Sequence, residues 1–272
     1  MNTRETEVIV LEVVKLNKYG VMRKMKLQQR MNANHLKMVA IIAMTIDHIC
    51  DLAYPGFPVA PVAIGLHIIG RLTAPIMWFF ICEGYYYTHN IKKYMLRMGL
   101  FALISHFAYC FAFGINMIPF STGIFNQTSV MYPLFIAIVV MWMQDNALPM
   151  KGRVKNVLIV LLILSAFPAD WSCVAVFAIL GMHKNRGNLK KQMLVMLLCV
   201  TVYSAVSFIF VSRSYALVQF GVLLVYPFLK QYNGKKGSAK WMKWFFYLYY
   251  PLHLVVIGIL RICIYGNIGL LF

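Results

Sequence analysis

The chain alternates between long apolar segments and short polar stretches from about residue 36 onward. Most apolar segments approach the roughly 20 residues that a helix needs to cross the hydrocarbon core of a bilayer. One segment, 171–182, is shorter, so the pattern predicts about nine crossings. We therefore expect an all-α fold: a polytopic integral membrane helix bundle. The segments are 36–54, 64–88, 94–114, 128–144, 154–169, 171–182, 192–211, 214–229 and 244–263.

Composition supports this interpretation and excludes others. Hydrophobic residues make up 61% of the 272 residues and charged residues 12%, against about 45–50% and about 25% in soluble proteins. So few charges could not cover the surface of a soluble enzyme, and such an apolar chain is not disordered. The formal net charge of +18 leaves one competing class, a basic nucleic-acid-binding protein.

The distribution of positive charge decides between these two classes. Of the 26 Lys and Arg residues, 23 fall at every second junction between apolar segments: before residue 38, and near 92–97, 151–155, 184–191 and 230–243. A nucleic-acid-binding protein would gather them on one folded face, so we expect no nucleic-acid partner. Alternating basic junctions mark the cytoplasmic side of a membrane. They predict a multi-pass protein of the bacterial cytoplasmic membrane with a cytoplasmic N-terminus.

The chain divides into a basic N-terminal extension, residues 1–33, and a membrane domain, residues 34–272. The extension has a short apolar run, Val8 to Leu11, flanked by Glu residues and lacking a cleavage site. This is not the layout of a signal peptide. An interfacial amphipathic helix and a flexible tail both remain open. The six cysteines are scattered without a CxxC pair, so we expect neither a disulfide framework nor a metal site.

Several ionisable residues lie inside apolar segments, where they are costly and usually face the bundle interior. Asp47 and Glu83 are the acids that topology does not explain, and Arg71 is the obvious cation for Asp47. The pair could be catalytic or a purely structural ion pair. Asp51 and Asp170 lie at segment ends, and we interpret them as solvated caps.

Histidines also lie within apolar segments, among them His48, His106 and His253. His48 follows Asp47, but neighbours on a helix point about 100° apart, so the two are no ready-made dyad. We interpret His106 as a packing residue, and we take His48 and His253 as catalytic candidates. A buried imidazole near a carboxylate and an Arg suits acyl transfer or proton transfer. A proton-coupled transporter would use the same residue types.

Three blocks of sequence narrow this choice. NHLKMVAIIAMTIDHIC, HIIGRLTAPIMWFFICEGYYYTHNIKKYMLRMGLFALIS and FFYLYYPLHLVVIGIL occur in this order between residues 34 and 263. Together they resemble the TraX family of polytopic inner-membrane proteins, whose founding activity is N-terminal acetylation of conjugative pilin. The family is itself similar to the wider transmembrane acyltransferase superfamily. The matched polar residues are Asp47, His48, Arg71, Glu83, Thr88, Asn90, Tyr94, Arg97 and His253.

The resemblance implies an acetyltransferase that uses cytosolic acetyl-CoA as co-substrate and a protein or glycan acceptor. His48 would be the general base, with His253 as a second candidate. Asp47, Arg71 and Glu83 would orient the base or stabilise developing charge. The cytoplasmic group would meet the CoA phosphates; it comprises Asn90, Lys92, Lys93, Tyr94 and Arg97.

Two alternatives from other classes stay open. The first is a proton-coupled transporter or exporter, although the sequence has no repeated halves with interrupted helices of the kind common in transporters. The second is a non-enzymatic assembly factor for a pilus or surface polymer.

Overall fold

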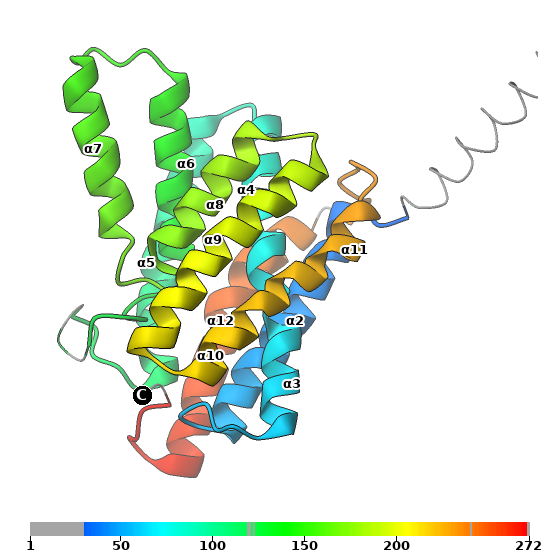
Figure 1. The fold of residues 1–272 in the computed structure, drawn as a ribbon, viewed down its shortest axis with the longest axis vertical. Coiled ribbons are helices and arrows are strands. Elements are labelled where there is room, and N and C mark those ends of the chain that lie inside the picture. The colour runs from blue at the N-terminus through cyan, green and yellow to red at the C-terminus, as the bar shows by residue number, and fades with distance from the viewer. Residues whose placement is uncertain (1–29, 119–120, 122, 240, 271–272) are drawn as a thin grey trace, which may run out of the picture.

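The computed structural model describes residues 30–118, 121, 123–239 and 241–270, and within them every regular element is a helix (Figure 1). The proposed extension 1–33 falls almost wholly outside these residues. The helices are α2 (Ala33–Ala53), α3 (Pro61–Gly70), α4 (Thr73–Tyr87), α5 (Ile91–Phe113), α6 (Met131–Asp145), α7 (Gly152–Ser165), α8 (Ser172–Lys184), α9 (Leu189–Phe210), α10 (Arg213–Val218), the 3-10 helix η1 (Gln219–Val225), α11 (Tyr226–Lys230) and α12 (Met242–Tyr265).

Three long helices start in the same way. Asn32, Asn90 and Asn188 precede α2, α5 and α9, and each side chain accepts a hydrogen bond from the backbone N–H three residues on. Such a cap satisfies one of the N–H groups that the first turn leaves free. A polar Asn just before an apolar run therefore fixes where each of these helices begins.

The apolar segments of the sequence all become helical in the structure. Four helical runs are long and apolar enough to cross a membrane: Pro61–Tyr87, Ile91–Phe113, Leu189–Phe210 and Met242–Tyr265. Met131–Asp145 and Ser172–Lys184 are shorter apolar helices. The predicted all-α membrane bundle is thus confirmed, whereas the number of crossings and the side of the N-terminus stay predictions.

Two apolar segments are broken where the sequence pattern predicts continuous helices. α3 ends at Gly70 and α4 begins at Thr73, leaving Arg71 in the junction. The segment 214–229 is divided into α10, η1 and α11. The two breaks lie against each other: a Cβ built on Gly221 would come within 3.0 Å of the Ile68 carbonyl oxygen and 3.2 Å of the Arg71 Cβ. The glycine permits this close approach, because any larger residue would push η1 away.

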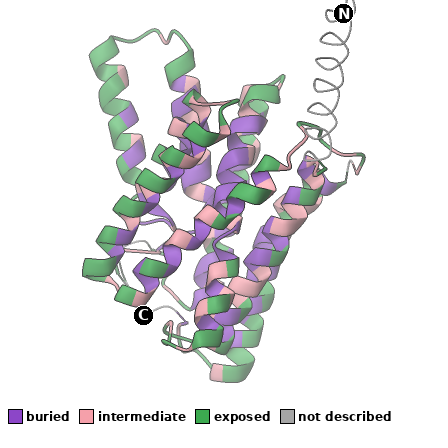
Figure 2. Ribbon diagram, turned by 45° about the vertical axis from the view of Figure 1, so that its right-hand side comes forward, coloured by how far each residue is buried: buried purple, intermediate pink, exposed green. Residues whose placement is uncertain are grey.

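Burial follows the arrangement expected of a protein surrounded by lipid. Buried residues line the centre of the bundle and exposed ones its outside (Figure 2). Large apolar side chains stand on that outside, among them Leu96, 74% exposed, and Ile209, 73% exposed. Helix α7 packs mainly against α6 and α8 and buries just two of its residues. An apolar exterior of this extent suits a hydrocarbon environment.

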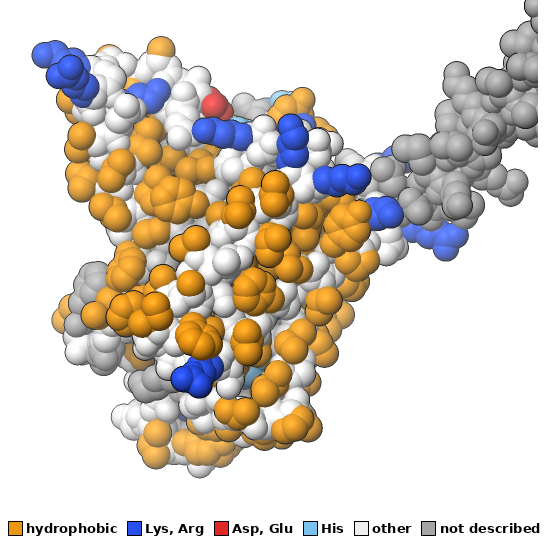
Figure 3. Space-filling view, in the orientation of Figure 1, with side chains coloured by type: hydrophobic (Ala, Val, Ile, Leu, Met, Phe, Trp, Pro, Cys, Tyr) orange, Lys and Arg blue, Asp and Glu red, His pale blue; other side chains and the backbone are white. Residues whose placement is uncertain are grey.

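The connections gather at two ends of the bundle. We call one of them the basic end. There Met31 forms an isolated β-bridge with Tyr232, and Glu83, near the end of α4, forms an ion pair with Arg186. At the other, the neutral end, Gln127 donates to the Pro168 carbonyl and Gly56 to that of Leu270. Figure 3 shows the Lys and Arg side chains of this face mostly at the basic end. The basic junctions that alternate along the sequence thus lie together at one end of the bundle, and the neutral junctions lie at the other.

Candidate functional site

A polar concavity lies between the helices toward the neutral end, and we call it the histidine cavity. It encloses about 880 Å³ of empty space, part of it open to the surroundings. Its lining comes from α2, the α3–α4 junction, α5, α10 and α12, and from the connections of the neutral end. Its lining includes Met44, Asp47, His48, Asp51, Phe57, Arg71, Met77, Tyr109, Phe113, Asn126, Asp170, Trp171, Tyr215 and Tyr250.

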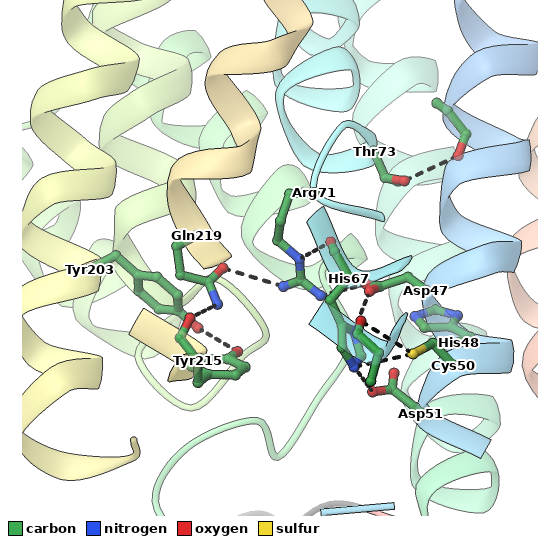
Figure 4. A network of polar contacts seen from close by, with 12 residues as sticks. Asp47, His48, Cys50, Asp51, His67, Arg71, Thr73, Tyr203, Tyr215 and Gln219 are labelled. Atoms are coloured by element: carbon green, nitrogen blue, oxygen red, sulfur yellow. Dashed lines mark hydrogen bonds and ion pairs between the residues drawn. The ribbon is translucent and has the colours of Figure 1, made fainter. Parts of the chain in front are cut away.

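Asp47 is the centre of a polar network on one wall of this cavity (Figure 4). Its carboxylate accepts one hydrogen bond from Arg71 Nη2 at 2.6 Å and contacts His67 Nδ1 at 2.8 Å. Arg71 also donates to Gln219 Oε1 at 3.3 Å, across to η1. The network therefore joins the two helix breaks to α2, and the expected Asp47–Arg71 pair is present.

The same wall leaves no room for a side chain at residue 70. A Cβ on Gly70 would overlap the Asp47 side chain. The glycine that ends α3 thus lets α2 approach closely enough for Asp47 to reach both His67 and Arg71.

His48 has a different partner from the one its position beside Asp47 suggests. Its Nδ1 lies 2.7 Å from His253 Nε2 on α12, and His253 Nδ1 lies 2.9 Å from the Tyr249 carbonyl oxygen. Because Asp47 faces His67 and Arg71 instead, it does not orient the His48 ring. His253 stands behind His48, while His48 lines the cavity. The two predicted catalytic histidines are therefore brought into direct contact.

Two acids that the sequence suggested as solvated caps line the cavity instead. Asp51 Oδ1 lies 3.9 Å from His67 Nε2, and its side chain is only 19% exposed. Asp170 lies in the connection between α7 and α8 and is half-buried. Burial raises the pKa of Asp170 to about 6; nearby Arg71 opposes this rise and Asp47 adds to it. The interpretation of Asp51 and Asp170 as solvated caps is wrong, because the connections at this end fold back over the bundle.

Glu83 lies away from this cavity. It accepts a hydrogen bond from Arg186 Nε at 2.7 Å, and Arg186 in turn lies 3.5 Å from the centre of the Tyr86 ring. The structure thus separates Glu83 from His48 and places it in an ion pair at the basic end.

A second, smaller cavity lies toward the basic end, and we call it the basic cavity. It encloses about 470 Å³ and shares one wall residue, Met77, with the histidine cavity. Helices α2, α4, α5, α6 and α12 surround it. Its lining is Lys37, Met77, Phe80, Ile81, Tyr94, Met98, Met131, Phe246 and Tyr247.

The predicted CoA-binding residues divide around this cavity. Tyr94 lines it, and the Arg97 guanidinium lies over the Tyr94 ring. Asn90 is engaged as the cap of α5, and Lys92 and Lys93 are exposed beside it. The structure therefore brings Tyr94 and Arg97 together and leaves the other three at the surface.

Neither His106 nor any cysteine lines the two cavities, although Cys50 Sγ lies 3.5 Å from His67 Nε2 in the Asp47 network. His106 contacts Thr128 Oγ1 at 2.9 Å and the Met117 carbonyl oxygen at 2.8 Å, and it lines neither cavity. All six cysteines are free. Within the described residues no group of His, Cys, Asp and Glu could hold a metal ion.

Sequence reasoning missed His67 and Lys37. His67 is 1% exposed and joins Asp47 to Asp51. The sequence feature that could have identified His67 is its position four residues before Arg71, because this spacing places both residues on one face of a helix. Lys37 was counted only among the topological charges.

The helices, the apolar exterior and the cavity lined by ionisable side chains together define a helical membrane protein with a polar cavity between its helices. The chain belongs to the TraX family: the family model described as TraX protein matches residues 32–261. It is also 28% identical over 233 residues to the probable fimbrial assembly protein FimC, serogroup H1, of Dichelobacter nodosus, covering 83% of this chain and 94% of that protein. No solved structure matches the chain.

Proposed function

We propose that this protein is a membrane acetyltransferase, which moves an acetyl group from acetyl-CoA to an amine or hydroxyl acceptor. The acceptor would be a pilin-like protein or a surface polymer, in keeping with the fimbrial role in the relative's name. The protein would cross the bacterial cytoplasmic membrane about nine times with its basic end in the cytoplasm, where acetyl-CoA is made. The positive-inside distribution of Lys and Arg supports this orientation.

The observation that carries the proposal is the hydrogen-bond chain behind His48. A carbonyl oxygen only accepts, so the Tyr249 contact requires a proton on His253 Nδ1. In a neutral imidazole the other nitrogen is then an acceptor, so His253 Nε2 accepts the hydrogen bond from His48 Nδ1–H. His48 Nε2 is consequently the nitrogen with the free electron pair. A histidine held in one tautomer at a cavity wall is suited to general-base catalysis.

The reaction follows from this arrangement. The acceptor N–H or O–H approaches His48 Nε2, which removes its proton as the acceptor atom attacks the thioester carbonyl carbon. The carbon–sulfur bond breaks, and the CoA thiolate takes the proton back from the His48 imidazolium. Arg71 stands on the same cavity wall, so its charge favours the developing oxyanion. Asp47 and His67 hold Arg71 in place rather than acting on the substrate.

Purified protein provides the test. Thiol release from acetyl-CoA is measured with peptides bearing free N-terminal amines and with surface glycans as acceptors. We expect His48→Gln to lower the rate by about 10²–10⁴-fold, while His106→Gln, the matched change at a histidine outside both cavities, leaves it unchanged. Full activity of His48→Gln would exclude His48 as the base. Mass spectrometry of surface proteins and glycans from cells with and without the gene would then identify the acetylated acceptor.

One observation favours a second candidate, a proton-coupled transporter or exporter. The two interrupted segments meet at Arg71 and Gln219, and transporters form their central sites from interrupted helices. This candidate predicts flux into proteoliposomes without acetyl-CoA. A non-enzymatic assembly factor, by contrast, would support assembly after both His48 and Arg71 are neutralised.

A further inference from the structure

Two cations without a carboxylate partner lie at the basic cavity: Lys37 lines it, and Arg97 lies over two of its aromatic rings. Lys37 Nζ lies 5.5 Å from the centre of the Phe80 ring and 5.3 Å from that of Phe246. The Arg97 guanidinium lies 5.4 Å and 5.1 Å from the Tyr94 and Tyr247 rings. Neither cation forms an ion pair in the part of the chain that the structure describes.

The buried side of Arg97 strengthens this observation. Its Nε is buried and has no hydrogen-bond partner among the described residues. Lys236 and Lys243 lie close enough to Lys37 to add further positive charge. Aromatic rings offset only part of the cost of a desolvated cation, and a buried donor without an acceptor is unfavourable. An anion bound between Lys37 and Arg97 would satisfy both.

The position of Lys37 relative to His48 constrains the shape of the ligand. They are eleven residues apart on α2 (48 − 37), about three turns, so both point to nearly the same face about 16 Å apart along the axis. Met77 lines both cavities and so lies between them. A ligand that reaches from one to the other needs an anionic head and a long uncharged arm.

We propose that Lys37 and Arg97 bind the phosphate groups of an organic phosphate, whose uncharged arm extends past Met77 toward His48. The assignment of the arm rests on the proposed acetyl transfer, because a CoA-type thioester has this build, with its phosphates at one end and its thioester at the other. The headgroup of an anionic phospholipid shares the phosphate chemistry. The site consists of Lys37 and Arg97 with the aromatic rings around them, and it excludes Asn90, Lys92 and Lys93.

Binding to the full-length protein tests the site without any need for turnover. Equilibrium binding of radiolabelled CoA is measured in nanodiscs of neutral lipid, and co-purified anionic lipid is quantified separately. We expect Lys37→Met and Arg97→Met each to weaken CoA binding by about tenfold or more, as the loss of one charge-assisted hydrogen bond implies. Lys92→Met removes the same charge from the surface and should change nothing. Lys37→Arg, which keeps the charge, should retain binding if the Met variant fails to fold.

The outcomes separate the two proposals. If the Met variants lose anionic lipid and bind CoA normally, the phosphate site stands and its ligand is the lipid headgroup. If they bind both CoA and anionic lipid as the unmodified protein does, the site is overturned. His48→Gln should bind CoA normally, so a protein that binds CoA through Lys37 yet transfers no acetyl group would refute the proposed function alone.

Discussion

The two cavities differ in how they treat charge. In the histidine cavity Arg71 and Asp47 contact each other, and His67 and Gln219 complete their hydrogen bonds. In the basic cavity Lys37 and Arg97 face aromatic rings and contact no carboxylate of the described chain. The ion pair between Arg71 and Asp47 holds helices together, whereas Lys37 and Arg97 are, in the proposed phosphate site, the residues that bind an anionic ligand. The comparison thus separates charges that join helices through ion pairs from charges that have no carboxylate partner in the described chain.

Replacing one cation at each cavity by Met should lower the free energy of unfolding by very different amounts. Arg71→Met leaves Asp47 buried without its cation, which we expect to lower the free energy of unfolding by about 3–5 kcal/mol. Arg97→Met removes contacts with aromatic rings and a hydrogen bond with the Tyr247 side chain but leaves no buried carboxylate unpaired, so we expect a smaller loss of about 1 kcal/mol. Denaturant unfolding in detergent measures both. Equal losses would show that the distinction between the two cavities is mistaken.

A matched pair of substitutions at His253 sharpens the role of the histidine cavity. His253→Gln keeps an acceptor oxygen near the place of Nε2, so His48 retains its tautomer and most of its activity. His253→Asn keeps the donor near the Tyr249 carbonyl but removes that acceptor, and we expect it to lower acetyl transfer by about 10–100-fold. It should also shift the pH–rate profile. If both variants lose activity equally with an unchanged profile, His253 has only a packing role.

The effect of Asp170 on the stability of the protein depends on pH. Its pKa is raised from 3.8 to about 6, so the folded state is favoured while the carboxyl is protonated and loses stability as pH rises through 6. Asp170→Asn should therefore stabilise the protein at pH 8, by at most about 3 kcal/mol, and leave it nearly unchanged at pH 4. Thermal unfolding at both pH values measures the difference. Destabilisation at pH 8 would indicate that the ionised carboxylate is required.

The sequence predicted the helices well because their signals are local. Apolar length and capping residues such as Asn90 determine where helices lie, and both can be found without knowing the tertiary fold. The break at Arg71 escaped the prediction of a continuous helix, although Gly70 at the end of α3 and Pro75 in the first turn of α4 are local signals for a helix end and a helix start. It depends on η1 packing against the junction, a contact between residues about 150 positions apart.

The candidate site was predicted in part. His48, Asp47, Arg71 and His253 were singled out because ionisable groups are rare in apolar segments, and the structure brings them together. Their pairing was not predictable, since which histidine faces Asp47 depends on how α2, α3 and α12 pack. Asp170 was misjudged for a related reason: a connection at a segment end can fold inward, and sequence position does not show this.

The shared wall at Met77 has a kinetic consequence. Under the proposed function, two cavities that share this one residue would hold donor and acceptor in separate spaces, so that neither has to leave before the other binds. Acetyl transfer should then proceed through a ternary complex, with intersecting double-reciprocal plots and no acetylated protein intermediate. Parallel plots, the signature of a ping-pong mechanism, would mean that donor and acceptor take turns in a single space.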